Sequence, residues 1–157
     1  MMRRVWKPAL AGLLSIVTAF AGALVLQTGD PAANPEAQAK NAAVLVRIAA
    51  CHSPEKTTVT AVAIGETDGK LQTITLQVIS LSTPGTLVVT HEWPEQGNWV
   101  VKFVARNPDY VNYATGALVP ANGATVDWHA AKQFWHEPSN EEVASMLRAG
   151  QLSATRR

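Results

Sequence analysis

The chain has 157 residues with a formal net charge of +1, and 47% of its residues are hydrophobic. Basic and acidic residues are nearly balanced and no basic patch is present, so the composition predicts no nucleic-acid partner. The single cysteine, Cys51, excludes an intramolecular disulfide.

Residues 1–26 have the layout of a signal peptide or a signal-anchor helix. Three basic residues precede an uncharged run of eighteen residues, Ala9 to Leu26, and no acidic residue occurs before Asp30. The basic residues are Arg3, Arg4 and Lys7. A positive end that stays in the cytoplasm followed by an apolar segment is typical of export signals. We therefore expect the rest of the chain outside the cytoplasmic membrane, either periplasmic or anchored in that membrane.

Two interpretations of this segment stay open at the sequence level. Ala19-Phe20-Ala21 and Ala21-Gly22-Ala23 both supply the small residues that a signal peptidase reads, so a cleaved protein would begin near Gly22 or Leu24. As a helix, the eighteen apolar residues would span about 27 Å, close to the hydrocarbon thickness of a bilayer. An uncleaved helix would make the membrane itself a partner of the protein.

Composition divides the remainder of the chain. Residues 27–40 are rich in Ala, Pro, Asn and Gln without apolar periodicity, which predicts a flexible linker. Residues 41–129 provide one folded domain, and residues 130–157 a C-terminal helical segment and tail. Without the three N-terminal basic residues, ten basic and twelve acidic residues remain, a net charge of about −2.

Short β-strands separated by turn signals dominate the domain. Alternation and β-branched residues predict strands at 43–49, 57–64, 71–79, 86–93, 98–105, 110–119 and 124–128. Asp68-Gly69, Pro84-Gly85 and Asn122-Gly123 are typical turn pairs between them. About seven strands at this spacing predict an all-β fold, an Ig-like antiparallel β-sandwich.

A short amphipathic helix is predicted after the strands, from Ser139 to Ala149. Ser139 and Glu142 form a capping box, and Val143, Met146 and Leu147 make an apolar stripe. Gly150 stands where a C-terminal cap is expected.

The stretch from Val59 to Asn107 resembles small exported bacterial Ig-like domains of the YtkA/FixH-like or CopC-like kind. The resemblance rests on Asp68-Gly69-Lys70, Pro84-Gly85 and the segment from Trp93-Pro94 to Gly97-Asn98-Trp99. These are turn and core residues, so the resemblance implies a fold rather than an activity. Copper-binding relatives use His and often Met ligands, and the only methionine here beyond the start is Met146.

Cys51 and His52 are the first candidates for a metal site. A thiolate and an imidazole suit copper or zinc, and His91, His129 and His136 could complete the ligand set. Alternatively, Cys51 is a small hydrophobic residue and His52 begins a loop, since neighbours on a strand point to opposite faces. A lipid-modified Cys51 is a third interpretation, because Ile48-Ala49-Ala50 precedes it.

Aromatic residues provide a second candidate site. Trp128 and Trp135 repeat at the same seven-residue spacing as His129 and His136, which on a helix would place each pair on one face. With Trp93, two exposed rings could stack on a carbohydrate; packed against the domain, the same rings would belong to its core.

Enzyme motifs are absent from the sequence: it has no GxSxG elbow, HExxH helix, phosphate loop or dinucleotide fingerprint. We therefore expect a non-catalytic module without a resident cofactor that binds an envelope protein. Metal binding and carbohydrate binding are the alternatives.

Overall fold

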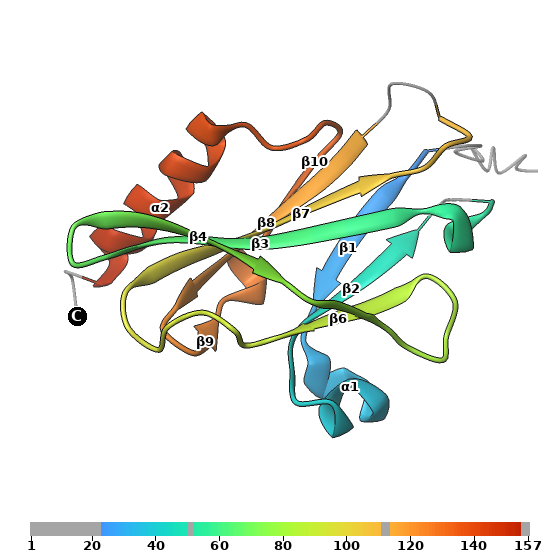
Figure 1. Cartoon of the computed structure of the whole chain (residues 1–157), viewed down its shortest axis with the longest axis horizontal. Coiled ribbons are helices and arrows are strands. Elements are labelled where there is room, and N and C mark those ends of the chain that lie inside the picture. The colour runs from blue at the N-terminus through green and yellow to red at the C-terminus, as the bar shows by residue number, and fades with distance from the viewer. Residues whose placement is uncertain (1–22, 50–51, 111–113, 155–157) are drawn as a thin grey trace, which may run out of the picture.

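Two antiparallel β-sheets pack face to face in the computed structural model, which describes residues 23–49, 52–110 and 114–154 (Figure 1). Sheet A has the order β1-β2-β6-β5, formed by Val25–Gly29, Ala42–Ala49, Thr86–Thr90 and Val78–Ser80. Sheet B has the order β10-β8-β7-β3-β4, formed by Lys132–Phe134, Ala114–Asn122, Asn98–Arg106, Thr58–Thr67 and Lys70–Leu76. The short strand β9 (Thr125–Val126) pairs with β8. The predicted all-β sandwich is confirmed at this level.

Alternating residues from both sheets form the main core. Val46 of sheet A and Val101, Phe103 and Val119 of sheet B belong to one buried cluster. Because successive side chains on a strand point to opposite faces, the intervening residues face outward. The alternation in the sequence thus marks the inward face of β7 correctly.

The turn between β3 and β4 follows the sequence signal closely. Thr67 pairs with Lys70 across a two-residue loop, and Asp68 and Gly69 both have positive φ, 52° and 73°. This conformation matches the right-handed twist of the strands and favours Asp-Gly. The turn therefore fixes the register of the whole hairpin.

The strand predicted at 71–79 is two strands in different sheets. β4 ends at Leu76 in sheet B, β5 begins at Val78 in sheet A, and only Gln77 lies between them. The backbone N–H of Gln77 donates to the Glu92 carboxylate at 3.3 Å. A polar residue at an outward position fits the alternation, so the sequence does not reveal this change of sheet.

The end of the apolar N-terminal run belongs to the sandwich, which corrects the assignment of residues 1–26 to one membrane-related helix. Leu24 and Leu26 are 0% and 1% exposed, and β1 pairs with β2 from Val25↔Ala49 to Gly29↔Leu45. The pairing buries apolar side chains that the sequence alone associates with a bilayer. Residues 1–22 lie outside the described residues.

Residues 27–40 are ordered elements, so the flexible linker is wrong. After β1, the short helix η1 (Pro31–Ala33) and helix α1 (Pro35–Ala39) follow, capped by the Asp30 and Asn34 side chains. Ala37 is buried, and the Glu36 carboxylate accepts hydrogen bonds from Ser82 N and Oγ at 2.9 and 2.6 Å. Helix capping and the hydrogen bonds between Glu36 and Ser82 hold this segment in place, so it is ordered although its sequence has no apolar periodicity.

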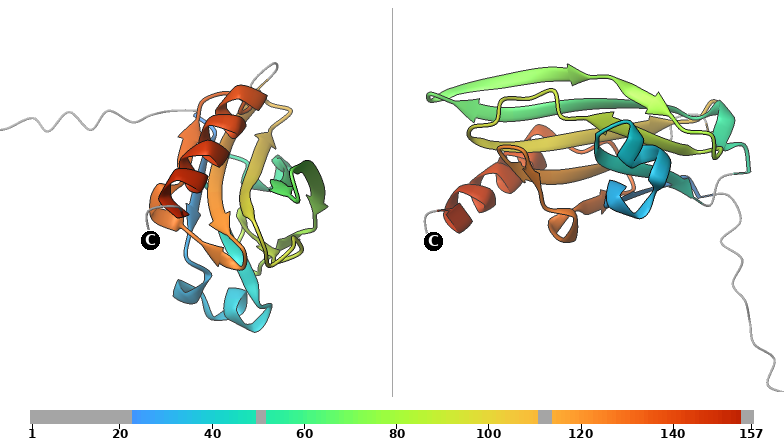
Figure 2. Two further views of the ribbon diagram at one scale, coloured as in Figure 1. Left: turned by 90° about the vertical axis from the view of Figure 1, so that its left-hand side faces the viewer. Right: turned by 90° about the horizontal axis from the view of Figure 1, so that it is seen from below.

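Helix α2 (Asn140–Ala154) lies on the outer face of sheet B, as both views of Figure 2 show. Its Val143, Met146 and Leu147 pack on Val100 of β7 and Leu118 of β8. The capping box is confirmed, because Glu142 N donates to Ser139 Oγ at 3.2 Å and Ser139 N donates to the Glu142 carboxylate at 2.7 Å. Gly150 lies inside the helix rather than at its end.

The segment between β8 and α2 differs from prediction. The strand expected at 124–128 is limited to β9, and Trp128 belongs to the short helix η3 (Trp128–Ala130) capped by Asp127. Another short helix, η2 (Pro54–Lys56), precedes β3. None of the helices in the described part of the chain combines the length and apolar character that crossing a bilayer requires.

Candidate functional site

The histidines predicted as metal ligands lie in different parts of the fold. His52 is exposed in the loop before η2, His129 is exposed in η3, and His136 is exposed after β10. Cys51 lies outside the described residues. Among the residues that the structure describes, no three His, Cys, Asp or Glu side chains come together in a way that could hold a metal ion.

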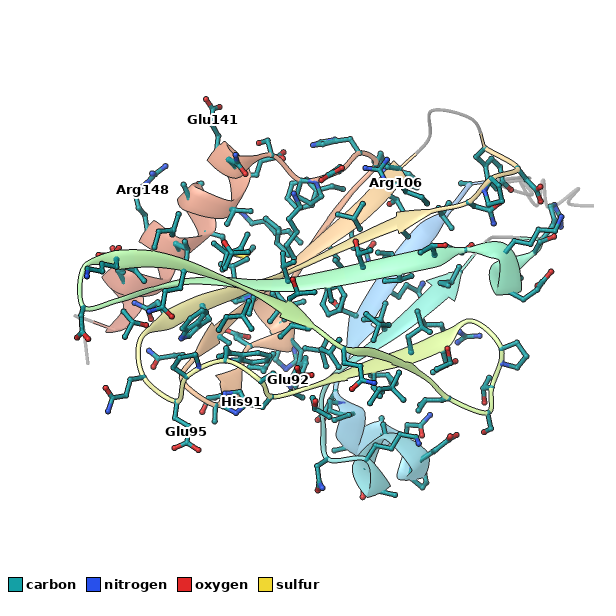
Figure 3. The ribbon with its side chains drawn as sticks, in the orientation of Figure 1. His91, Glu92, Glu95, Arg106, Glu141 and Arg148 are labelled. Atoms are coloured by element: carbon teal, nitrogen blue, oxygen red, sulfur yellow. The ribbon has the colours of Figure 1, made fainter. Side chains whose placement is uncertain are left out.

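His91 follows β6 and packs against an aromatic neighbour. Its ring meets Trp93 edge to face, with centroids 4.5 Å apart. Its Nε2 atom is buried and has no hydrogen-bond partner among the residues that the structure describes. Figure 3 shows His91, Glu92 and Glu95 along the same loop. The aromatic contact gives His91 a packing role at this end of the sandwich.

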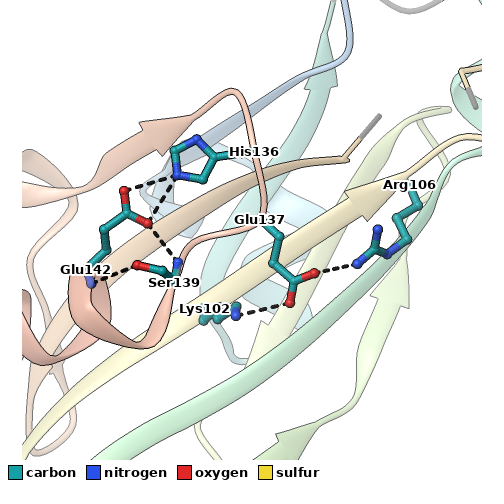
Figure 4. A network of polar contacts seen from close by, with 6 residues as sticks. All are labelled: Lys102, Arg106, His136, Glu137, Ser139 and Glu142. Atoms are coloured by element: carbon teal, nitrogen blue, oxygen red, sulfur yellow. Dashed lines mark hydrogen bonds and ion pairs between the residues drawn. The ribbon is translucent and has the colours of Figure 1, made fainter. Parts of the chain in front are cut away.

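His136 lies between β10 and α2, and its side chain contacts the first turn of α2 (Figure 4). Its Nε2 lies 3.1 Å from Glu142 Oε1, so the imidazole and the capping box share one carboxylate. The hydrogen bond from the Ser139 backbone is the main cause that lowers the pKa of Glu142 below its usual 4.5, and the His136 contact contributes. Ser139 Oγ accepts from Glu142 N, so this hydroxyl completes a helix cap.

Protonation of two carboxylates is expected to weaken the fold in acid. The pKa values of Glu142 and Glu36 are both lowered from 4.5, the latter mainly by the hydrogen bonds from Ser82. A lowered folded-state pKa contributes stability above about pH 4.5 that is lost as the pH falls through the folded value. We expect Glu142→Gln to lower the free energy of unfolding at pH 7 and to have a smaller effect at pH 3, measured by urea unfolding.

Glu141→Gln is the matched control, because Glu141 is exposed in the same first turn of α2 but outside the capping box. This variant should lose only the attraction between a negative side chain and the positive N-terminal end of the helix. Equal losses for both variants at pH 7 would contradict a specific role for the Glu142 carboxylate.

A second polar group holds the connection between β10 and α2 onto sheet B (Figure 4). Glu137 accepts from Lys102 Nζ at 3.2 Å and pairs with Arg106. Pro138 follows and lies over Gly116 of β8, where any Cβ would collide with the proline ring. These contacts position the segment that leads into α2 on the outer face of sheet B.

Trp93, Trp128 and Trp135 do not form a stacking surface in the structure. Trp93 is 3% exposed and its Nε1–H donates to the Gly123 carbonyl at 2.9 Å. Trp128 is half-buried and packs against the main core. Trp135 is 62% exposed and lies just after the short strand β10. The segment from Trp128 to Trp135 is not one helix but the short helix η3 followed by strand β10. The seven-residue spacing therefore does not place the two rings on one helix face.

In the part of the chain that the structure describes, the outer face of sheet B is covered over β7 and β8. Helix α2 and its preceding segment pack on β7 and β8, and Ile64 of β3 lies at the margin of this cluster. The right-hand view of Figure 2 shows β3 and β4 (green) at the margin away from α2 (red). The outward residues of β4 are exposed. Leu71 is 70% exposed, a larger fraction than that of the other exposed large hydrophobic side chain in the described part of the chain, Trp135.

Strand β4 is also a free edge of sheet B. It pairs with β3 over seven residues without a register shift, and no described strand pairs with its other side. The two-residue turn makes Thr67 and Lys70 a hydrogen-bonded pair, so the N–H and C=O groups of Leu71, Thr73 and Thr75 point away from β3. The next outward group, Gln77 N–H, is engaged by Glu92.

The other edges in the described part of the chain are shorter. β1 has five residues, and β5 and β10 have three each. Short edges, prolines and bulges protect natural sheets from unintended pairing. β4 contains no proline and no bulge, and its only charged residue is Lys70 at the turn. It is therefore the edge best suited to accept another strand.

Comparisons with protein-family models, with curated proteins and with solved structures gave no match. Sequence reasoning did not identify the β4 edge as a site. The signal was present in Leu71, a large apolar residue at an outward position between Lys70 and Gln72, but edge position depends on long-range strand order.

Proposed function

We propose that this protein is an exported, non-catalytic β-sandwich module that binds an extended segment of another envelope protein along β4. The observation that carries the proposal is the open, regular edge at Leu71, Thr73 and Thr75. Strand addition uses backbone hydrogen bonds for affinity and alternate side chains for specificity.

An Ig-like architecture is part of this proposal. The order β1-β2-β6-β5 opposite β4-β3-β7-β8 corresponds to strands A-B-E-D opposite C′-C-F-G of Ig-like sandwiches. In this correspondence β4 is the strand C′ at the free margin, and β10 extends the sheet beyond strand G. The order supports the resemblance to small exported Ig-like domains, which are turn-rich sandwiches without a shared activity.

The chemistry of the surface defines the partner. A strand beside β4 would place alternate side chains over the outer face, next to the exposed side chains of Leu71, Thr73 and Thr75. These positions favour apolar or β-branched side chains on the incoming segment. Lys70 at the turn favours an acidic residue opposite it.

The size of the edge favours an extended segment over a second copy of the chain. A seven-residue strand is about 24 Å long, and with a sheet about 10 Å thick it offers on the order of 240 Å² per partner. A stable interface between folded proteins covers about 800 Å² per partner. An extended segment can continue beyond the strand across the outer face, which a rigid second sandwich cannot do as readily.

Site-specific crosslinking in intact cells tests this proposal. With a photoreactive phenylalanine analogue at Leu71, we expect one discrete adduct whose second component is another envelope protein. Adding Thr73→Pro removes an outward N–H and should reduce the adduct about tenfold, since one lost hydrogen bond plus steric exclusion exceeds about 1.4 kcal/mol.

Thr73→Val is the matched control, because it keeps the N–H and should keep the adduct. A thermal melt checks that the proline variant stays folded, and Thr75→Pro provides a second version of the same test. The proposal is wrong if Leu71 yields no adduct, if the adduct survives both proline changes, or if a probe at Arg148 of α2 captures the same protein. An adduct of twice the chain's own mass would mean that the partner at β4 is a second copy of the chain and not an extended segment of another protein.

A further inference from the structure

The two sheets share one margin of the sandwich at β4 and β5. β4 is the last strand of sheet B, β5 is the last strand of sheet A, and the chain passes from one to the other through Gln77 alone. No described strand pairs with the far side of either. A segment that joins β4 would therefore lie beside both sheets at this margin, and not only along the edge of one.

The inner face of β4 changes from buried to exposed along this margin. Leu76 is 4% exposed, Ile74 is half-buried and Gln72 is exposed. Ile74 packs against the main core from sheet B, and the half-buried Val78 of β5 packs against it from sheet A. Removing the remaining apolar surface of these two side chains from water would be favourable.

The opposite margin of sheet B is closed by the chain itself. β9 and β10 pair with β8, and η3 lies between them, held by the hydrogen bond from Asp127 N–H to the Pro120 carbonyl at 2.9 Å. From this position Trp128 of η3 is half-buried and packs against the main core. An apolar side chain carried by a segment at the sheet margin therefore completes the core there, whereas β3 is the only described strand paired with β4.

Alternation determines which residues of a guest strand would face inward at β4. The outward backbone groups of β4 belong to Leu71, Thr73 and Thr75, whose side chains lie on the outer face. Guest residues paired with these three also lie on the outer face, and the residues between them face inward, opposite Gln72 and Ile74. In antiparallel pairing these inward positions are the non-hydrogen-bonded ones, where facing side chains approach most closely.

We propose that the guest segment on β4 carries an apolar residue opposite Ile74, and that this side chain inserts between the margins of the two sheets beside Ile74 and Val78. The guest then completes the main core from this margin as Trp128 does from the other. The guest residue opposite the exposed Gln72 is polar. This inference rests on the proposed function and narrows it, because a guest that is apolar only on its outer face would not cover Ile74 and Val78.

A second crosslinking position tests the inward direction. With the photoreactive phenylalanine analogue at Gln72, on the inner face, we expect intact cells to yield an adduct with the same protein as the analogue at Leu71, on the outer face. In the chain that carries the Leu71 probe, Ile74→Thr should reduce the adduct about fivefold, the upper range for one cross-strand side-chain pair. Ile74→Val keeps an apolar side chain and should keep the adduct.

Ile64→Thr is the matched control, because Ile64 is also half-buried but packs on the outer face of sheet B, with β4 between it and the guest. It should leave the Leu71 adduct unchanged. A thermal melt shows whether each variant stays folded. If Ile74→Thr unfolds, the Gln72 probe decides the question alone.

The outcomes separate this inference from the proposed function. A Leu71 adduct without a Gln72 adduct, or a Gln72 adduct with a different protein, overturns the inward side chain and leaves binding at β4 in place. A Leu71 adduct that a folded Ile74→Thr variant leaves unchanged, or that Ile64→Thr reduces equally, does the same. The absence of an adduct at both positions overturns this inference together with the proposed function.

Discussion

Leu26→Ala is expected to lower the free energy of unfolding by about 2–5 kcal/mol. Leu26 is 1% exposed in the main core, and truncation would remove apolar contacts and leave a cavity between the sheets. A domain of this size has a total stability of about 5–15 kcal/mol, so the loss is a large fraction of it. Urea unfolding of the purified protein, followed by tryptophan fluorescence, measures the change.

Gln27→Ala is the control for Leu26, because Gln27 is the next residue of β1 and is exposed. A surface substitution of this kind should change stability by no more than about 0.5 kcal/mol. Similar small effects at both positions would mean that β1 is not part of the stable sandwich. Leu24, Val25 and Leu26 would then be available to a membrane helix together with the rest of the apolar run.

Trp93→Ala is expected to cost about 3–5 kcal/mol, the range for removal of a buried aromatic side chain. The indole is 3% exposed, its Nε1–H is bound to the Gly123 carbonyl, and His91 packs on its ring. Trp93→Phe should cost less, because it keeps most of the ring volume and loses mainly the hydrogen bond to Gly123. Thermal and urea unfolding measure both variants.

Trp135→Ala is the matched control, since Trp135 is 62% exposed. We expect a change within about 0.5 kcal/mol. Carbohydrate binding predicts a different pattern, in which Trp93 variants lose a fluorescence response to glycans while stability is preserved. That pattern would contradict the core role of Trp93.

Local patterns in the sequence predicted the parts of the fold that local chemistry controls. The alternation in β7, the Asp68-Gly69 turn and the Ser139/Glu142 capping box depend on neighbouring residues, and each is found as expected. In β4 the buried face is visible in the sequence because the outward Thr73 and Thr75 are polar, whereas Ile74 and Leu76 face the core.

Long-range pairing explains what the sequence did not reveal. β1 follows basic residues and a long apolar stretch, so its partner β2, about twenty residues later, is invisible to a local pattern. The same limit applies to the four histidines, whose types suit a metal but whose positions depend on the fold. The open edge of β4 also follows from strand order, since any of the predicted strands could have been the marginal one.

The contact between Gln77 and Glu92 gives the β4 edge a defined length. Outward backbone groups run from Leu71 to Thr75, and the following N–H is already taken by the Glu92 carboxylate just before the chain enters sheet A. Backbone pairing with a guest strand would therefore stop at Gln77 at one end of β4 and at the turn of Asp68 and Gly69 at the other. The edge would therefore pair with about five to seven residues of a guest strand. A longer guest would gain contacts only from its side chains, without further backbone pairing.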